Sequence, residues 1–229
     1  MKSDTYMENF KIKYNFKIII VMCLGVFMIG VSVGFNRIAN FGTDPFSCMN
    51  LGISKYLNTA FNLNISYGTC QLIVNLLLLA VMLLTLRRSL GLGTIVNMVG
   101  CGYIGDFTVW VFGLLGITTE GMHEYFIIRI LLMLVGVLAL GFGAALYMHC
   151  DIGIAPYDAL GPILENGTKG KWKFQWIRIS TDVLCVVIGF LCGSVVGVAT
   201  AITAFFTGPL VTFFRKRLPD MHADRLAEE

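Results

Sequence analysis

Charged residues are scarce in this sequence. Only 14% of its 229 residues are Asp, Glu, Lys or Arg, whereas 56% are hydrophobic, and the mean hydropathy is +0.77. A water-soluble domain carries about 25% charged residues because its surface must be solvated. The shortage of charge therefore excludes a soluble globular protein. The net charge of +3 is gathered between apolar runs, so no nucleic-acid partner is expected.

Two common signatures of catalysis and metal binding are also missing. The sequence has no H-E-x-x-H and no phosphate-binding glycine loop followed by Lys and Ser or Thr. Its three histidines are dispersed, and its seven cysteines form no C-x-x-C pair. We expect the cysteines to pack inside apolar segments, although Cys48 and Cys70 could form a disulfide if they share a face. These observations predict no enzyme, no cofactor and no metal site.

Long apolar runs are what the sequence does contain. A helix that crosses a hydrocarbon core of about 30 Å needs about 20 apolar residues. Six runs approach or exceed this length: Ile18 to Ala39, Tyr67 to Leu86, Leu92 to Ile117, Tyr125 to Cys150, Phe174 to Cys192 and Val195 to Phe214. The sequence therefore predicts an all-α membrane protein with six transmembrane helices in a single membrane domain, residues 1–229.

Clusters of Lys and Arg predict the orientation, because such residues accumulate in short cytoplasmic loops. The clusters are the N-terminal lysines Lys11, Lys13 and Lys17, the pair Arg87 and Arg88, the three lysines Lys169, Lys171 and Lys173, and finally Arg215, Lys216 and Arg217. Six spans and an inside N-terminus put every cluster in the cytoplasm, with tails 1–17 and 215–229. The opposite side would hold Asp44, Lys55, Glu120, His123 and Glu124.

The two halves of the sequence resemble each other. Gly25 aligns with Gly136, Gly42 with Gly153 and Pro45 with Pro156, each 111 positions later; Gly91 aligns with Gly197, Thr94 with Thr200 and Gly102 with Gly208, each 106 positions later. We interpret residues of about 18–117 and 125–214 as duplicates of three spans. Because three is odd, the second copy must enter the membrane from the opposite face, which gives two inverted three-helix repeats, as in many secondary transporters.

A short connector follows the first span of each repeat. It reads Gly42-Thr-Asp-Pro45-Phe in the first copy and Gly153-Ile-Ala-Pro156-Tyr in the second. Each opens a helix-like stretch of about 10 to 13 residues, which is too short to span. Proline suits a first helical turn, and Thr43 or Asp44 could cap the first copy. The stretches either re-enter the membrane, where their helix starts would form a site for a polar or anionic solute, or lie flat on its two surfaces.

Ionisable residues inside spans usually face a cavity or a partner. Asp106 has no basic neighbour at helical spacing, which makes it a candidate contact for a proton, a cation or a solute. Arg178 precedes Asp182 by four residues, so the pair either forms a local ion pair or lines a pathway. Arg129 is expected either to extend outward to the membrane surface or to contact an anion. The residues assigned to a substrate or ion pathway are Asp44, Pro45, Asn75, Asp106, Pro156, Asp158, Arg178 and Asp182.

The repeated G-x-x-P-[FY] motif, together with Gly91-Leu-Gly93-Thr94, resembles the bacterial YczE/YyaS/YitT-like membrane proteins. In that family the first connector often continues as Pro-Trp-Asp; here Asp158 keeps the acid of the second connector, whereas Ser47 replaces it in the first. The resemblance covers about Gly25 to Phe214 and implies a multi-pass protein of the bacterial cytoplasmic (inner) membrane. It supplies no substrate, because the family is uncharacterised.

Two functions fit these features. The first is a secondary transporter or permease for a small polar or anionic solute, favoured by the inverted duplication. The second is a non-transporting membrane subunit, either the substrate-binding component of an uptake complex or a regulatory protein that docks on partner membrane subunits through its small-residue faces.

Overall fold

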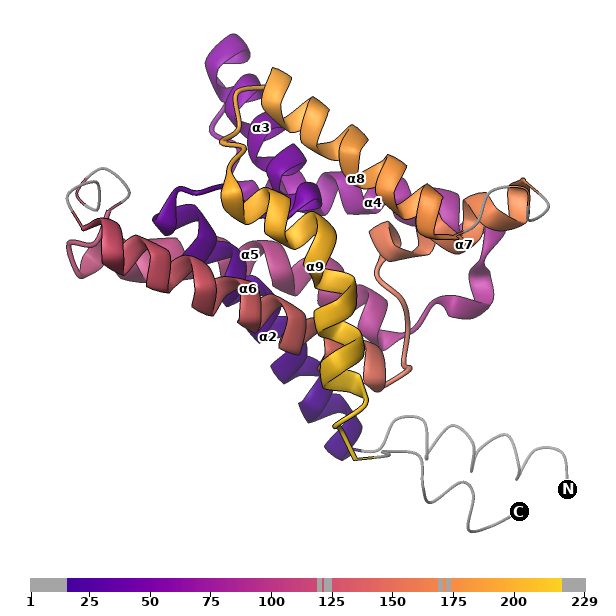
Figure 1. Ribbon diagram of the computed structural model, residues 1–229. Helices are drawn as coiled ribbons and strands as arrows, with labels where there is room; N and C mark the ends of the chain where they lie inside the picture. Colours follow the sequence, from indigo (N-terminus) through magenta and orange to yellow (C-terminus); the bar gives the residue numbers. More distant parts are fainter. Residues whose placement is uncertain (1–15, 119–120, 122–124, 169–170, 172–173, 220–229) are drawn as a thin grey trace, which may run out of the picture.

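Every regular element in the described part of the chain is helical (Figure 1). The computed structural model describes residues 16–118, 121, 125–168, 171 and 174–219. The helices are α2 (Phe16–Ala39), α3 (Pro45–Phe61), α4 (Tyr67–Thr85), the 3-10 turn η1 (Arg87–Ser89), α5 (Leu92–Leu114), α6 (Phe126–His149), α7 (Pro156–Gly167), α8 (Phe174–Leu191) and α9 (Val198–Arg215). Some residues used to predict the orientation lie outside the described part of the chain: Lys11, Lys13, Glu120, His123, Glu124, Lys169 and Lys173.

Five of these helices are long and apolar enough to cross a membrane, namely α2, α4, α5, α6 and α9. The chain is therefore an all-helical membrane protein. The predicted fifth span, Phe174 to Cys192, coincides with α8, an 18-residue helix that carries Arg178 and Asp182 and is not among these five. The six predicted runs match helices with ends displaced by at most three residues, because hydropathy changes sharply at each loop.

The first connector helix is longer than expected. α3 has 17 residues, against the predicted 10 to 13, while α7 has 12. The helix continues through Gly52, which packs against Gly189 of α8, and ends at Asn62, which adopts the left-handed conformation (φ 54°).

The centre of the protein is the crossing of α2 and α6, the first long helices of the two halves. A Cβ atom added at Gly25 would lie 2.7 Å from the Gly143 carbonyl oxygen, and one added at Gly143 would lie 2.7 Å from that of Gly25. Further along, Gly136 contacts the side chain of Asn36. Since Gly25 meets the late part of α6 and Asn36 the early part, the helices run antiparallel. Glycine permits this close approach in a lipid environment, where packing drives association.

The two connectors join the bundle in the same way. The Gly93 N–H donates to the Ile152 carbonyl at 3.0 Å, and the Ala199 N–H donates to the Phe41 carbonyl at 2.9 Å. Gly153 and Gly42, which follow these two carbonyls, have φ of +130° and +94°, where a side chain would be strained. Each connector thus binds the start of the last helix of the other half.

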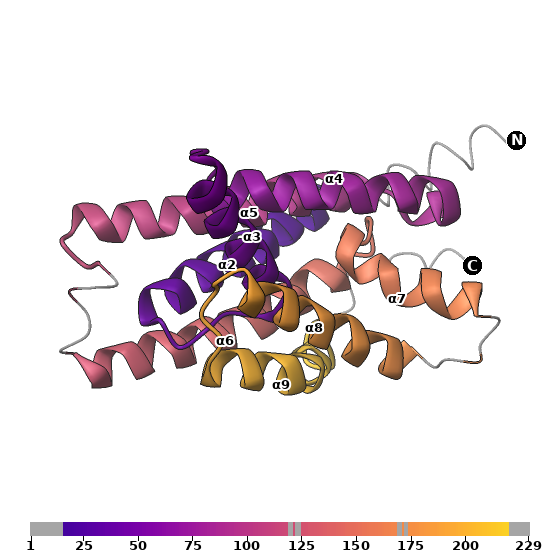
Figure 2. The same ribbon diagram turned by 90° about the horizontal axis from the view of Figure 1, so that it is seen from above.

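The connector helices also pack across the halves. α3 lies along α8 and α7 contacts α4. Figure 2 shows α4 and α9 on opposite sides of the molecule, with α2 between them. All seven cysteines are free; Cys48 and Cys70 are buried in α3 and α4 and do not form the disulfide that the sequence left open.

Candidate functional site

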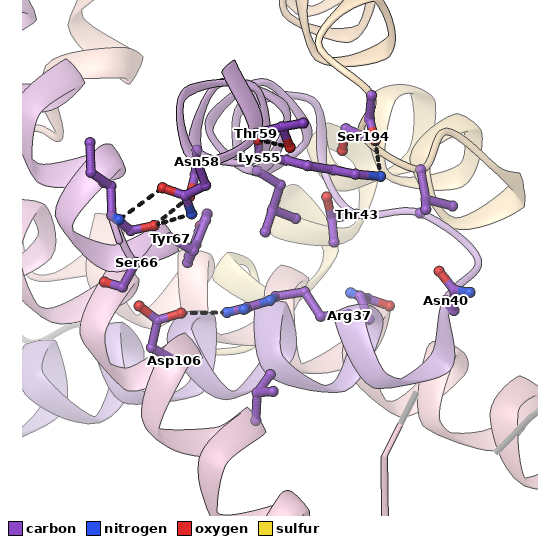
Figure 3. Close-up of a pocket in the computed structure, with 18 residues that line it drawn as sticks. Arg37, Asn40, Thr43, Lys55, Asn58, Thr59, Ser66, Tyr67, Asp106 and Ser194 are labelled. Carbon is purple, nitrogen blue, oxygen red and sulfur yellow. Dashed lines mark hydrogen bonds and ion pairs between the residues drawn. The ribbon is translucent and has the colours of Figure 1, made fainter. Parts of the chain in front are cut away.

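A polar cavity of about 560 Å³ opens among α2, α3, α4, α5 and the segment between α8 and α9 (Figure 3). Its charged lining residues are Arg37, Lys55 and Asp106. Thr43, from the first connector, also faces it. Of the predicted pathway residues only Asp106 lines this cavity.

Asp106 is held by a basic residue from another helix. Its Oδ1 accepts a hydrogen bond from Arg37 at 2.7 Å, and its Oδ2 accepts one from the backbone N–H of Gly68, in the first turn of α4, at 2.7 Å. The guanidinium also lies 5.0 Å from the centre of the Tyr67 ring. Arg37 and Asp106 meet because α2 and α5 pack side by side and bring the two charges together.

Lys55, like Arg37, lines the cavity but is not among the pathway residues predicted from the sequence. It projects from α3, and its Nζ donates to the Gly193 carbonyl at 2.9 Å, just after the end of α8. The contact joins residues 138 positions apart, so local spacing could not reveal it. One feature of the sequence could have indicated it, because Lys55 is a lone lysine on the side of the membrane predicted to be nearly free of positive charge.

Arg178 organises a second polar cluster between α7 and α8. Its Nη1 donates to Asp158 at 2.7 Å, and its Nε lies 3.4 Å from Asp182. The Tyr157 hydroxyl donates to Asp182, and the Arg178 guanidinium lies 4.7 Å from the centre of the Tyr157 ring. The predicted Arg178–Asp182 pair is confirmed, and Asp158, predicted from the connector, completes it.

The starts of α3 and α7 meet between the cavity and this cluster. The Phe46 and Tyr157 rings stack with their centres 4.4 Å apart. The hydroxyl groups of Ser47 and Tyr67 form a hydrogen bond of 2.8 Å. Of the two predicted caps, Thr43 and Asp44, it is Asp44 that caps α3, by accepting the N–H of Ser47 at 3.0 Å.

Three predicted pathway residues stay apart from both clusters. Pro45 and Pro156 occupy the first turns of α3 and α7, where their role is to start a helix. Asn75 is buried in α4 with 2% exposure; it is not a lining residue of the cavity and forms none of the contacts of Arg178 described above.

Two further residues have structural roles. Arg129 is 8% exposed, and its Nε donates to the Ala39 carbonyl at 2.8 Å, so it caps the end of α2 and does not extend outward as predicted. Gly30-Val-Ser32-Val-Gly34 has the spacing of a hydrolase nucleophile motif, but it lies inside α2, where the buried Ser32 hydroxyl donates to the Ile29 carbonyl at 2.8 Å. That motif needs a strand-to-helix turn, so no nucleophile is assigned.

Comparison with known proteins gives uncharacterised bacterial relatives. An uncharacterized protein of Haemophilus influenzae is 29% identical over 203 residues, which cover 87% of this chain and 84% of the relative. The uncharacterized membrane protein YczE of Bacillus subtilis is 25% identical, covering 71% of this chain and 73% of its own. YyaS of the same organism is 21% identical, with coverage of 83% and 89%.

The resemblance to YczE and YyaS found from the connector motifs is therefore confirmed. No solved structure matches the chain. The family of unknown function DUF6198 matches residues 16–216. The chain belongs to this family of membrane proteins, DUF6198.

Proposed function

We propose that this protein is a secondary transporter for a small polar or anionic solute, and not an enzyme. Its six spans, with α8 as the fifth, form two inverted repeats in the bacterial cytoplasmic membrane. The antiparallel crossing of α2 and α6 supports the inversion, because these are corresponding helices of the two repeats. Inverted repeats place solute sites near the bilayer midplane, at the repeat interface.

The Phe46–Tyr157 stack favours re-entrant connectors over connectors that lie flat. The two rings occupy corresponding positions of the repeats and touch each other. A residue can touch its own counterpart only near the two-fold axis, and the axis of an inverted repeat lies in the membrane plane. The starts of α3 and α7 would then lie at the midplane, with α3 returning to one face and α7 to the other.

The cavity is the observation that carries the proposal. It reaches Thr43, just before the start of α3, and contains charged side chains that lipid would not tolerate. Beyond the Phe46–Tyr157 stack, the Arg178 cluster ties α7 to α8. A transporter that works by alternating access has, in each state, a cavity open on one side and a closed, ion-paired region on the other. The cavity and the Arg178 cluster fit one such state.

The distribution of basic residues sets the proposed orientation. In Figure 1 the start of α2 and the end of α9 lie at the bottom and the end of α7 lies at the right, so together they mark the lower right end of the molecule. The ends of α8 and α3 lie toward the upper left. The lower right end carries Lys17, Lys171 and Arg215 to Arg217. This favours cytoplasmic termini and a cavity that opens to the outside.

Uptake by the purified chain alone tests the proposed function. Reconstituted into liposomes, it should accumulate radiolabelled small solutes when a proton or sodium gradient is imposed, and empty liposomes should not. A bulky maleimide attached at Thr59→Cys, in the cavity wall, should abolish uptake, whereas the unsubstituted protein treated in the same way should retain it. Uptake that appears only after partner membrane subunits are added would reject autonomous transport and support a non-transporting subunit.

A further inference from the structure

The charges around the cavity do not balance. Both carboxylate oxygens of Asp106 are already occupied, Oδ1 by Arg37 and Oδ2 by the Gly68 N–H, so Arg37 and Asp106 neutralise each other. Lys55 donates to a carbonyl oxygen, which is neutral. Among the residues that the structure describes, no carboxylate forms an ion pair with it. The cavity therefore carries one uncompensated positive charge.

The ammonium of Lys55 has capacity for a ligand. It has three protons, and the Gly193 carbonyl accepts one of them. The side chain is exposed and lines the cavity, so the other two protons are available there. A positive charge at the mouth of a cleft with protein walls is screened less than one on an open surface, and it raises the local concentration of anions.

The size and lining of the cavity define the class of anion. A volume of 560 Å³ lies within the usual range for small organic ligands, roughly 300–1,000 Å³, and far exceeds what a single halide needs. Figure 3 shows Lys55 on one side of the space, Arg37 on the other and Thr43 between them. Among the residues that the structure describes, the Thr43 hydroxyl makes one long contact, of 3.5 Å to the Asp44 carbonyl, and it can rotate toward a ligand.

We propose that this cavity binds a small organic anion with its carboxylate or phosphoryl oxygens at Lys55. The inference rests on the proposed function, since it names the charge class of the solute that would be carried. Binding is nevertheless measurable without transport, so each can fail independently.

The local charge is tested with a cysteine at Thr59, an exposed cavity residue four positions after Lys55. The measured quantity is the ratio of the modification rates by an anionic and a cationic methanethiosulfonate reagent, corrected for the protein without Thr59→Cys. Lys55→Gln should lower this ratio on the order of tenfold, because one unit charge near the thiol is removed. Lys55→Arg, which keeps the charge, and Lys171→Gln, outside the cavity, should leave it unchanged.

Binding is tested by protection of the same cysteine at constant ionic strength. Sodium lactate and sodium phosphate are the anionic probes, with glycerol and choline chloride as neutral and cationic controls. At least one anion should slow modification of Thr59→Cys severalfold when Lys55 is present, and should not slow it when Lys55→Gln is added. Protection by lactate would identify a carboxylate as the group bound, and protection by phosphate would identify a phosphoryl group. Three results would each overturn the proposal. They are a rate ratio that Lys55→Gln leaves unchanged, protection by glycerol equal to that by the anions, and protection by neither anion.

Discussion

Replacing Gly143 with alanine is expected to lower the free energy of unfolding by about 3 kcal/mol, at the upper end of the usual cost of overpacking. The new methyl carbon would lie 2.7 Å from the Gly25 carbonyl oxygen, which belongs to the backbone of α2 and cannot rotate away. The helices must therefore separate at the crossing that holds the two halves together. Unfolding of the purified protein in mixed micelles, followed by circular dichroism, measures the effect.

Gly113→Ala is the matched control for this prediction. Gly113 also lies in a long helix, α5, but a Cβ atom there meets nothing within 4 Å. Removing the flexibility of a helical glycine should raise stability by roughly 0.5–1 kcal/mol. The two substitutions are chemically identical and should have opposite signs. Equal effects would mean that α2 and α6 do not approach as closely as described.

Asp106→Asn is expected to cost about 2 kcal/mol of stability. The change leaves the Arg37 guanidinium without its counter-ion in a partly buried position, and the side chains of the pair are 21% and 23% exposed. This exposure reduces the cost below the 3–5 kcal/mol typical of breaking a fully buried pair. Chemical unfolding measures the loss.

The double variant Arg37→Gln with Asp106→Asn distinguishes an ion pair from two independent residues. Removing both charges should recover most of the loss, so that the interaction free energy in the double-mutant cycle is about 1–2 kcal/mol. Additive losses would contradict the pairing. The cycle also matters for transport assays, since loss of uptake in Asp106→Asn alone would combine a site effect with a folding effect.

Sequence alone predicted the helices well, because the information is local. The six long helices follow hydropathy, and Asp44, which caps α3, is one of the two caps expected before Pro45, the other being Thr43. The corresponding glycines marked the two connector junctions, since Gly42 and Gly153 both need positive φ.

The contacts of the candidate site could not be predicted in this way. Arg37 meets Asp106 across 69 positions, and Lys55 meets Gly193 across 138. Such pairs depend on how helices pack, which periodicity within one helix does not encode. The same limit explains Arg129, which local reasoning placed at the membrane surface and which instead caps α2.

Sidedness of Lys55 and Lys171 tests the central claim, that the two repeats lie inverted in the membrane. Each lysine is replaced with cysteine, and intact cells are treated with a membrane-impermeant maleimide, using the unsubstituted protein to measure the background from the native cysteines. Position 55 should be labelled in intact cells, and position 171 only after the membrane is permeabilised. Labelling of both positions from the same side would contradict the account.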